Sequence, residues 1–127
     1  MIQFESIDGE TVWCDPDIIQ VICYANEPGV SAIMFSSAWM IRVRETVENL
    51  VRRVGAYIPL VQFGHPSMVD TWINRNCVKA LTQAPANESG DVTWIVTGVS
   101  GASESVVSSS DPMDVLLLEL YPEDALQ

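Results

Sequence analysis

Short alternations of apolar and polar residues, separated by turn residues, run through positions 1–44 and predict a series of strands. An apolar residue at every second position is typical of a strand with one buried face. The turns are predicted at Asp8-Gly9, Asp15-Pro16-Asp17 and Asn26–Gly29, where Gly, Pro and Asx residues favour reversal of the chain. The predicted strands are Ile2–Ile7, Thr11–Cys14, Ile18–Ala25, Val30–Phe35 and Trp39–Arg44.

The pattern becomes helical directly after the last of these strands. Apolar residues then recur at the spacing of one helix face, at Val47, Leu50, Val51 and Val54. Thr46 is a suitable N-cap, and Gly55 is a residue type that commonly ends a helix. We therefore expect one short helix after the strands.

The second half of the chain resembles the first. Residues 3–22 align with residues 62–81 without a gap, and "ANEPG" at 25–29 is similar to "ANESG" at 86–90. The aligned pairs are Gln3-Phe4 with Gln62-Phe63, Trp13 with Trp72, Asp15 with Asn74, Asp17 with Asn76, Ile19 with Val78, and Ile22 with Leu81. This agreement indicates a unit of about sixty residues that occurs twice.

The predicted fold is α+β, with two tandem β-rich repeats of antiparallel strands and one short C-terminal helix in each. The repeats are residues 1–55 and 58–127 in one compact domain. One face of each sheet must be covered, either by packing of the two repeats about a pseudo-two-fold or by dimerisation of whole chains. The second helix is expected to be capped by Asp111 with Pro112 at its first position. The Gly- and Ser-rich stretch 97–110 lengthens the last hairpin of the second repeat, and no phosphate-loop lysine follows its glycines.

The first repeat resembles the small bacterial FlbD-family proteins over residues 1–54. The matching segments are Asp8-Gly9, Asp15–Ile19 and Val43–Leu50. Residues 58–121 would be a diverged second copy, in which "HPSM" replaces the Asp-Gly turn. The resemblance implies a fold, and it supplies neither catalytic residues nor a flagellar role.

The charge and cysteine content restrict the classes of function. Seventeen acidic and six basic residues give a net charge of −11, which disfavours direct nucleic-acid binding and fits a basic protein partner. Three cysteines without a Cys-x-x-Cys pair indicate a reduced, cytoplasmic protein rather than a disulfide framework. The N-terminus lacks the features of a signal peptide, and the apolar run "VLLLEL" is too short to cross a membrane.

No motif names a reaction, a metal or a cofactor. His65 is the single histidine and is expected in a loop, and the three cysteines are expected to be small buried residues. Asp15 and Asp17 are interpreted as turn formers, because the second copy has uncharged asparagines in their places. Trp13 and Trp72 are expected to pack in the core or between the repeats, since both copies have them.

The most informative polar feature is a cluster of arginines in a strongly acidic chain. Four of the six basic residues lie at the end of the first repeat, at Arg42, Arg44, Arg52 and Arg53. Three interpretations remain open: neutralisation within the chain, a contact between protomers that uses the acidic tail, and a site for a small anionic, nucleotide-like ligand. Trp39 starts the adjacent strand, and packing within the chain is the favoured interpretation, with an exposed anchor for a partner as the alternative.

From these features we expect a non-catalytic interaction module that forms homo-oligomers. One alternative is a small acidic inhibitor, such as an immunity or anti-defence protein acting on a basic partner. The other is sequestration of a small anionic ligand at an arginine-lined interface. No membrane association is expected.

Overall fold

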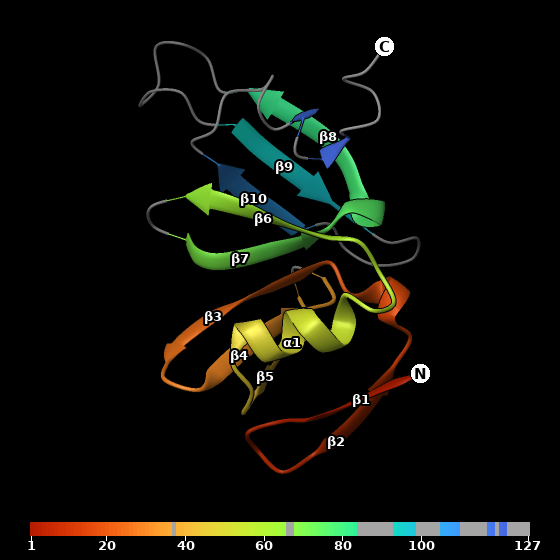
Figure 1. Cartoon of the computed structure of the whole chain (residues 1–127), viewed down its shortest axis with the longest axis vertical. Coiled ribbons are helices and arrows are strands. Elements are labelled where there is room, and N and C mark those ends of the chain that lie inside the picture. The colour runs from red at the N-terminus through yellow and green to blue at the C-terminus, as the bar shows by residue number, and fades with distance from the viewer. Residues whose placement is uncertain are drawn as a thin grey trace.

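Antiparallel strands dominate the α+β fold of this chain (Figure 1). The computed structural model describes residues 1–36, 38–65, 68–83, 93–98, 105–109, 117–118 and 120–121. The strands are β1 (Ile2–Glu5), β2 (Thr11–Cys14), β3 (Val21–Glu27), β4 (Val30–Met34), β5 (Met40–Val43), β6 (Leu60–His65), β7 (Met68–Asn74), β8 (Val78–Gln83), β9 (Thr93–Thr97) and β10 (Ser105–Ser109). The helices are α1 (Val47–Val54) and two short 3₁₀ helices, η1 (Pro16–Ile18) and η2 (Arg75–Cys77).

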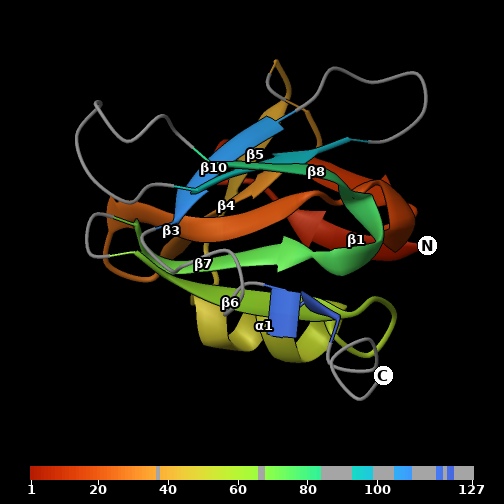
Figure 2. The same cartoon turned by 90° about the horizontal axis from the view of Figure 1, so that it is seen from above.

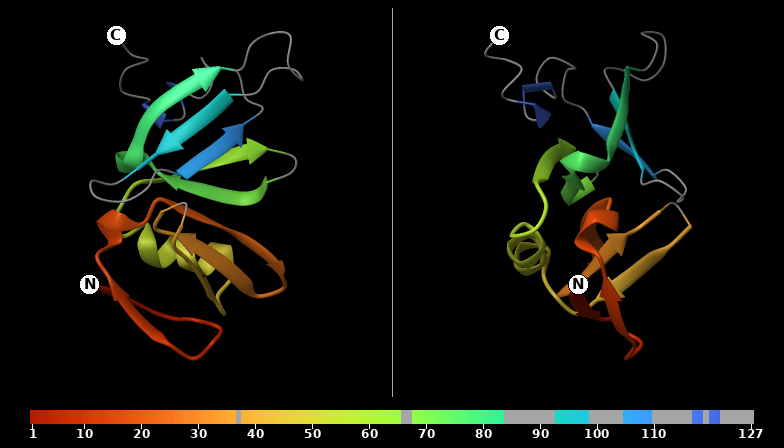
Figure 3. Two further views of the ribbon diagram at one scale, coloured as in Figure 1. Left: turned by 180° about the vertical axis from the view of Figure 1, so that it is seen from behind. Right: turned by 90° about the vertical axis from the view of Figure 1, so that its right-hand side faces the viewer.

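The strands form three sheets that follow one another along the long axis. A five-stranded sheet has the order β5-β4-β3-β7-β6, and it is flanked by the hairpin β1-β2 and by the sheet β10-β9-β8. The end of β1 reaches the central sheet through a bridge between Ser6 and Val43. β1 and β2 lie at one end of the molecule and β8 and β9 at the other, while β3 and β7 meet in the middle (Figures 1 and 3).

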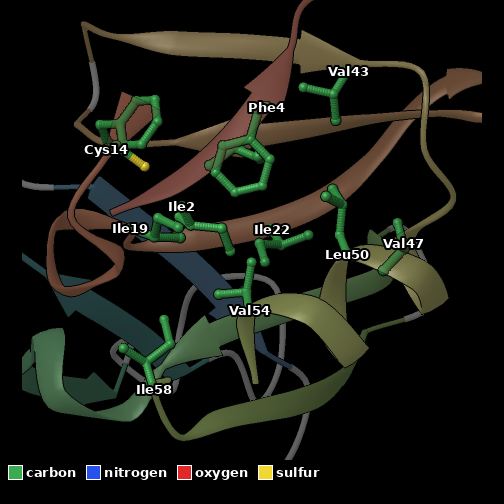
Figure 4. Packing of buried hydrophobic residues seen from close by; sticks show 12 residues of the cluster. Ile2, Phe4, Cys14, Ile19, Ile22, Val43, Val47, Leu50, Val54 and Ile58 are labelled. Atoms are coloured by element: carbon green, nitrogen blue, oxygen red, sulfur yellow. The ribbon is translucent and has the colours of Figure 1, made fainter. Parts of the chain in front are cut away.

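The larger hydrophobic cluster lies between α1 and the strands of the first half. α1 presents Val47, Leu50 and Val54 to this cluster, and it lies across the cluster from β4 and β5 (Figures 2 and 3). Phe4 and Ile22 point into the same space (Figure 4). Burying one such face of α1 is the main stabilisation available to a helix of this length.

A second, smaller cluster lies on the side of the second half. Val21 from β3, Ile73 from β7 and Leu120 are fully or almost fully buried there. The partly buried residues packed around them are Met34, Val61, Val78, Leu81 and Tyr121. β3 gives Ile22 to the larger cluster and Val21 to the smaller one, so the two clusters lie on opposite faces of this strand.

The order of elements is the same in both halves. Each begins with a hairpin and continues with a 3₁₀ helix and a three-stranded meander; α1 follows the first meander, and the helical residues Leu117, Leu118 and Leu120 follow the second. η1 starts at Pro16 and η2 at Arg75, which is the spacing of 59 positions seen in the sequence alignment. The halves meet through unlike elements, because β3 of the first meander pairs with β7 of the second hairpin.

The local predictions for the first half agree well with the structure. Thr46 caps α1 by accepting a hydrogen bond from the backbone N–H of Asn49, and Gly55 follows the last helical residue. Gly9 has the positive φ of 89° that its turn requires. The strands match within a few residues, and β3 starts at Val21 because η1 occupies the predicted beginning of that strand.

Two predictions about single residues are wrong. His65 is the last residue of β6 and not a loop residue, since β6 extends to a pairing between His65 and Met68. Trp13 is 60% exposed, whereas Trp72 packs against the larger cluster as expected. The predicted helix start at Asp111 lies outside the described residues, as does half of the 97–110 stretch; Leu117, Leu118 and Leu120 are helical.

Candidate functional site

The structure separates the four arginines that are adjacent in the sequence. Arg44 and Arg53 line one hollow, while Arg52 lines another beside Trp72. Arg42 points to the solvent from the outer face of β5, where Ile41 and Val43 point inwards. The change from strand to helix after Val43 turns the following side chains in other directions.

Arg53 is held by contacts within the chain. Its guanidinium donates to the Glu45 carboxylate and to the backbone carbonyl of Gln3, and it stacks over the Phe4 ring at 5.2 Å. Glu45 also accepts a hydrogen bond of 2.7 Å from the Asn49 side chain. Arg53 therefore joins α1 to β1, as the interpretation of neutralisation within the chain predicts.

The hollow beside Arg53 has mixed charge. Its volume is about 310 Å³, and it is lined by Arg44 and Arg53 together with Glu5, Glu45 and Gln3. An anion placed there would meet two carboxylates as well as two guanidinium groups. This geometry gives little support to a dedicated site for a small anion.

Arg53 is expected to stabilise the fold, and Arg52 is not. Arg53→Ala should lower the free energy of unfolding by about 1–2 kcal/mol, because it removes charge-assisted hydrogen bonds and a cation–π contact that are partly shielded from water. Arg52→Ala, whose 3.6 Å pair with Glu48 is exposed, should change it by less than about 0.5 kcal/mol. Urea unfolding of both variants tests this, and equal losses would contradict the assignment.

Several large apolar side chains remain in contact with solvent. Trp39 is 51% exposed, although its ring lies 4.6 Å from the Phe35 ring, so it is fixed and accessible at the same time. The strand begins only at Met40, which is also exposed. Trp39 is therefore exposed, as an anchor for a partner protein must be, and it also packs against Phe35.

Several hydrogen bonds of Asn74 join the two halves at their junction. The backbone N–H of Asn74 donates to the Gln20 carbonyl and its side-chain amide donates to the Ile19 carbonyl, both at 2.9 Å. Its side-chain oxygen accepts from the backbone N–H of Asn76, in the way that Asp15 accepts from Asp17. Both side chains therefore cap a 3₁₀ helix, and Asn74 also holds the two halves together.

Burial raises the pKa of all three cysteine thiols, although Cys23 is half-buried and not fully buried as expected. It raises the pKa of Cys14 from 9.0 to about 11, with an added effect of the Asp15 carboxylate. It raises the pKa of Cys77 to about 11 as well, with Asp17 adding to the effect. Thiolate is the reactive form of cysteine, so neither residue is suited to nucleophilic chemistry near neutral pH.

These thiols should also affect stability at high pH. Unfolded thiols ionise above about 9, whereas the buried thiols keep their protons until about 11, so the protein should lose stability as the pH rises through this range. A Cys14→Ala/Cys77→Ala variant should lose less stability between pH 9 and 11 than the natural chain. Parallel slopes in pH-dependent urea unfolding would contradict this cause.

Metal-ligating groups are not gathered in the described part of the chain. Among residues 1–36, 38–65 and the later described segments, no group of three or more His, Cys, Asp or Glu residues could hold a metal ion. In the same residues, no helix is both long enough and apolar enough to cross a membrane.

The comparisons with known proteins do not place this chain in a family. No family model matches it, and no curated protein and no solved structure is similar to it. What the chain does must therefore be argued from its own surface and interior.

Proposed function

We propose that this protein is a non-catalytic module that associates with copies of itself, built from two tandem FlbD-like repeats. One observation carries the proposal: large apolar side chains are exposed at several places on a chain that has a well-packed interior. They are Met1, Trp13, Tyr24, Trp39, Met40, Tyr57, Leu117 and Leu118. Exposed aromatic and aliphatic side chains of this size are typical of protein interaction surfaces.

The strand edges support the same proposal. Within the described residues, β2 and β8 are the outermost strands of their sheets, and no strand pairs with their outer edges. An unpaired edge presents N–H and C=O groups that can accept a further strand from another chain. Self-association through these edges needs neither a cofactor nor a reactive side chain.

The tandem arrangement is part of this proposal. It is supported by the recurring order of elements and by the equal spacing of the two 3₁₀ helices. The pairing of β3 with β7 joins unlike elements, so we favour a head-to-tail succession of repeats over packing about a pseudo-two-fold.

Native mass spectrometry and sedimentation at several protein concentrations test the proposed function. We expect an oligomer with a mass that is a multiple of the 14.0 kDa chain. A chain that stays monomeric at every concentration would contradict it.

An acidic inhibitor is the second candidate, and one observation favours it. The side chains of Glu5, Asp8, Glu10, Asp15 and Asp17 are all exposed on or beside the β1-β2 hairpin. A basic protein would be attracted to this end of the molecule, and the complex should weaken steeply with salt. Capture of one basic protein from the host at low salt, with loss of that protein at high salt, would support this candidate.

A further inference from the structure

We infer that the oligomer forms head to tail, by addition of β2 of one copy to the free edge of β8 in the next copy. The inference rests on the proposed self-association and names its two surfaces. It is derived from the junction inside the chain, where the second hairpin already pairs with the first meander. With the alignment spacing of 59 residues, β7 corresponds to β2 and β3 corresponds to β8. The pairing of β3 with β7 inside the chain therefore corresponds to a pairing of β8 with β2 of another copy.

The internal junction shows what such an interface needs. In it, Val21 of β3 pairs with Ile73 of β7, and Ile22 pairs with Trp72. Trp72 and Leu60 from the second hairpin pack against the larger hydrophobic cluster. Trp72 lies beside α1, where it lines a hollow together with Val47 and Val51.

The equivalent residues of the first hairpin have no such cover. Trp13 corresponds to Trp72 and Met1 to Leu60, and they are 60% and 79% exposed. Cys14 and the corresponding Ile73 are both buried, so the two hairpins have equivalent inner faces. The first hairpin therefore presents the surface that the second hairpin uses at the junction.

The receiving surface is also repeated and open. Ala80 and Leu81 of β8 correspond to Val21 and Ile22 of β3, and a hollow of about 350 Å³ lies beside them. Leu117 and Tyr121 line this hollow, and Leu117 is 45% exposed. The C-terminal helical residues thus lie beside β8 as α1 lies beside β3. The hollow between them leaves space for Trp13 of another copy.

The charges at the two edges are complementary. In the internal junction, Asn74 donates its backbone N–H to Gln20. The residues at the corresponding positions are Asp15 on the hairpin and Lys79 on β8, both exposed. The side-chain amide of Asn74 also donates to the Ile19 carbonyl, and the Asp15 carboxylate has no such donor. Asp15 would instead meet the Lys79 ammonium, whereas an aspartate at position 74 would meet the uncharged Gln20.

The two surfaces belong to different copies, because β2 and β8 lie at opposite ends of the chain (Figures 1 and 3). A contact between unlike surfaces is heterologous, and it produces a ring when the rotation closes and a filament when it does not. Each chain that joins the oligomer would therefore lengthen the row of repeats by two.

The experiment uses one variant for each surface. Trp13→Lys places a charge on the donor edge and Leu117→Lys places one in the receiving hollow, and both residues are exposed, so the chain should still fold. We expect each variant alone to be monomeric by sedimentation. An equal mixture should form a dimer, because one undamaged β2 and one undamaged β8 remain. Tyr57→Lys, at a residue that is 65% exposed and outside both surfaces, is the matched control and should behave as the natural chain.

The other outcomes separate the two proposals. If the natural chain oligomerises and either surface variant oligomerises equally well, self-association stands and the head-to-tail interface is wrong. If both variants are monomeric and their mixture also stays monomeric, the interface is symmetric and the inference falls. A monomeric natural chain overturns both, with exposed Lys79 then protecting the β8 edge, a common role of lysine on edge strands. Circular dichroism of each variant confirms that it is folded.

Discussion

Asn74→Asp should lower the free energy of unfolding by about 3 kcal/mol or more, although it changes a single side-chain atom. Asn74 is fully buried, and its amide donates to the Ile19 carbonyl at the junction of the two halves. Aspartate would remove this donor and place a carboxylate against a carbonyl oxygen. The cap of η2 would survive, since the remaining oxygen can still accept from the N–H of Asn76.

The chain supplies its own control for this substitution. Asp15 holds the corresponding position and caps η1 in the same way, but it is exposed. Asp15→Asn should therefore change the stability by less than about 0.5 kcal/mol. Thermal and urea unfolding measure both variants at pH 7 and again near pH 4, where protonation of the introduced carboxyl should recover part of the loss. Equal effects of the two substitutions would show that burial at the junction is not what distinguishes the positions.

Leu50→Ala should destabilise the protein by about 2–5 kcal/mol, the usual loss for a leucine removed from a closed core. Leu50 is fully buried on the inner face of α1, where it points at Ile22 (Figure 4). The substitution would leave a cavity between α1 and the sheet. A close-packed interior has little freedom to move into that space.

Leu118→Ala is the matched control, because Leu118 is also in a helical segment but is 53% exposed. We expect it to change the stability by less than about 0.5 kcal/mol. The comparison is made by urea unfolding at a protein concentration at which sedimentation shows both variants to be monomeric, because Leu118 is among the exposed side chains to which self-association is attributed. A small loss for Leu50→Ala would mean that α1 contributes little to the core.

Local features were predictable because their causes lie within a few residues. The turns at Asp15 and Gly9 and the cap at Thr46 each depend on one side chain or one backbone angle. The equivalence of Asp15 and Asn74 as turn formers followed from the alignment for the same reason. The α+β class followed from the sequence of periodicities.

The arrangement of the four arginines was less predictable, because side chains that are close in the sequence can point in different directions. Arg42, Arg44, Arg52 and Arg53 span a strand, a bend and a helix, and each of these turns its side chains differently. The partnership of Arg53 with Gln3 joins residues that are far apart along the chain. No local pattern contains such a contact.

The sequence by itself determined the kinds of elements, their order, the capping residues and the acidic surface. Only the tertiary structure decided that β3 pairs with β7, that Asn74 is buried while Asp15 is not, and that Trp72 is covered while Trp13 is exposed. The physical reason is that both members of each pair have similar side chains and similar neighbours in sequence. Their environments differ because β7 of the second hairpin pairs with β3 of the same chain, whereas among the described residues β2 of the first hairpin pairs with β1 alone.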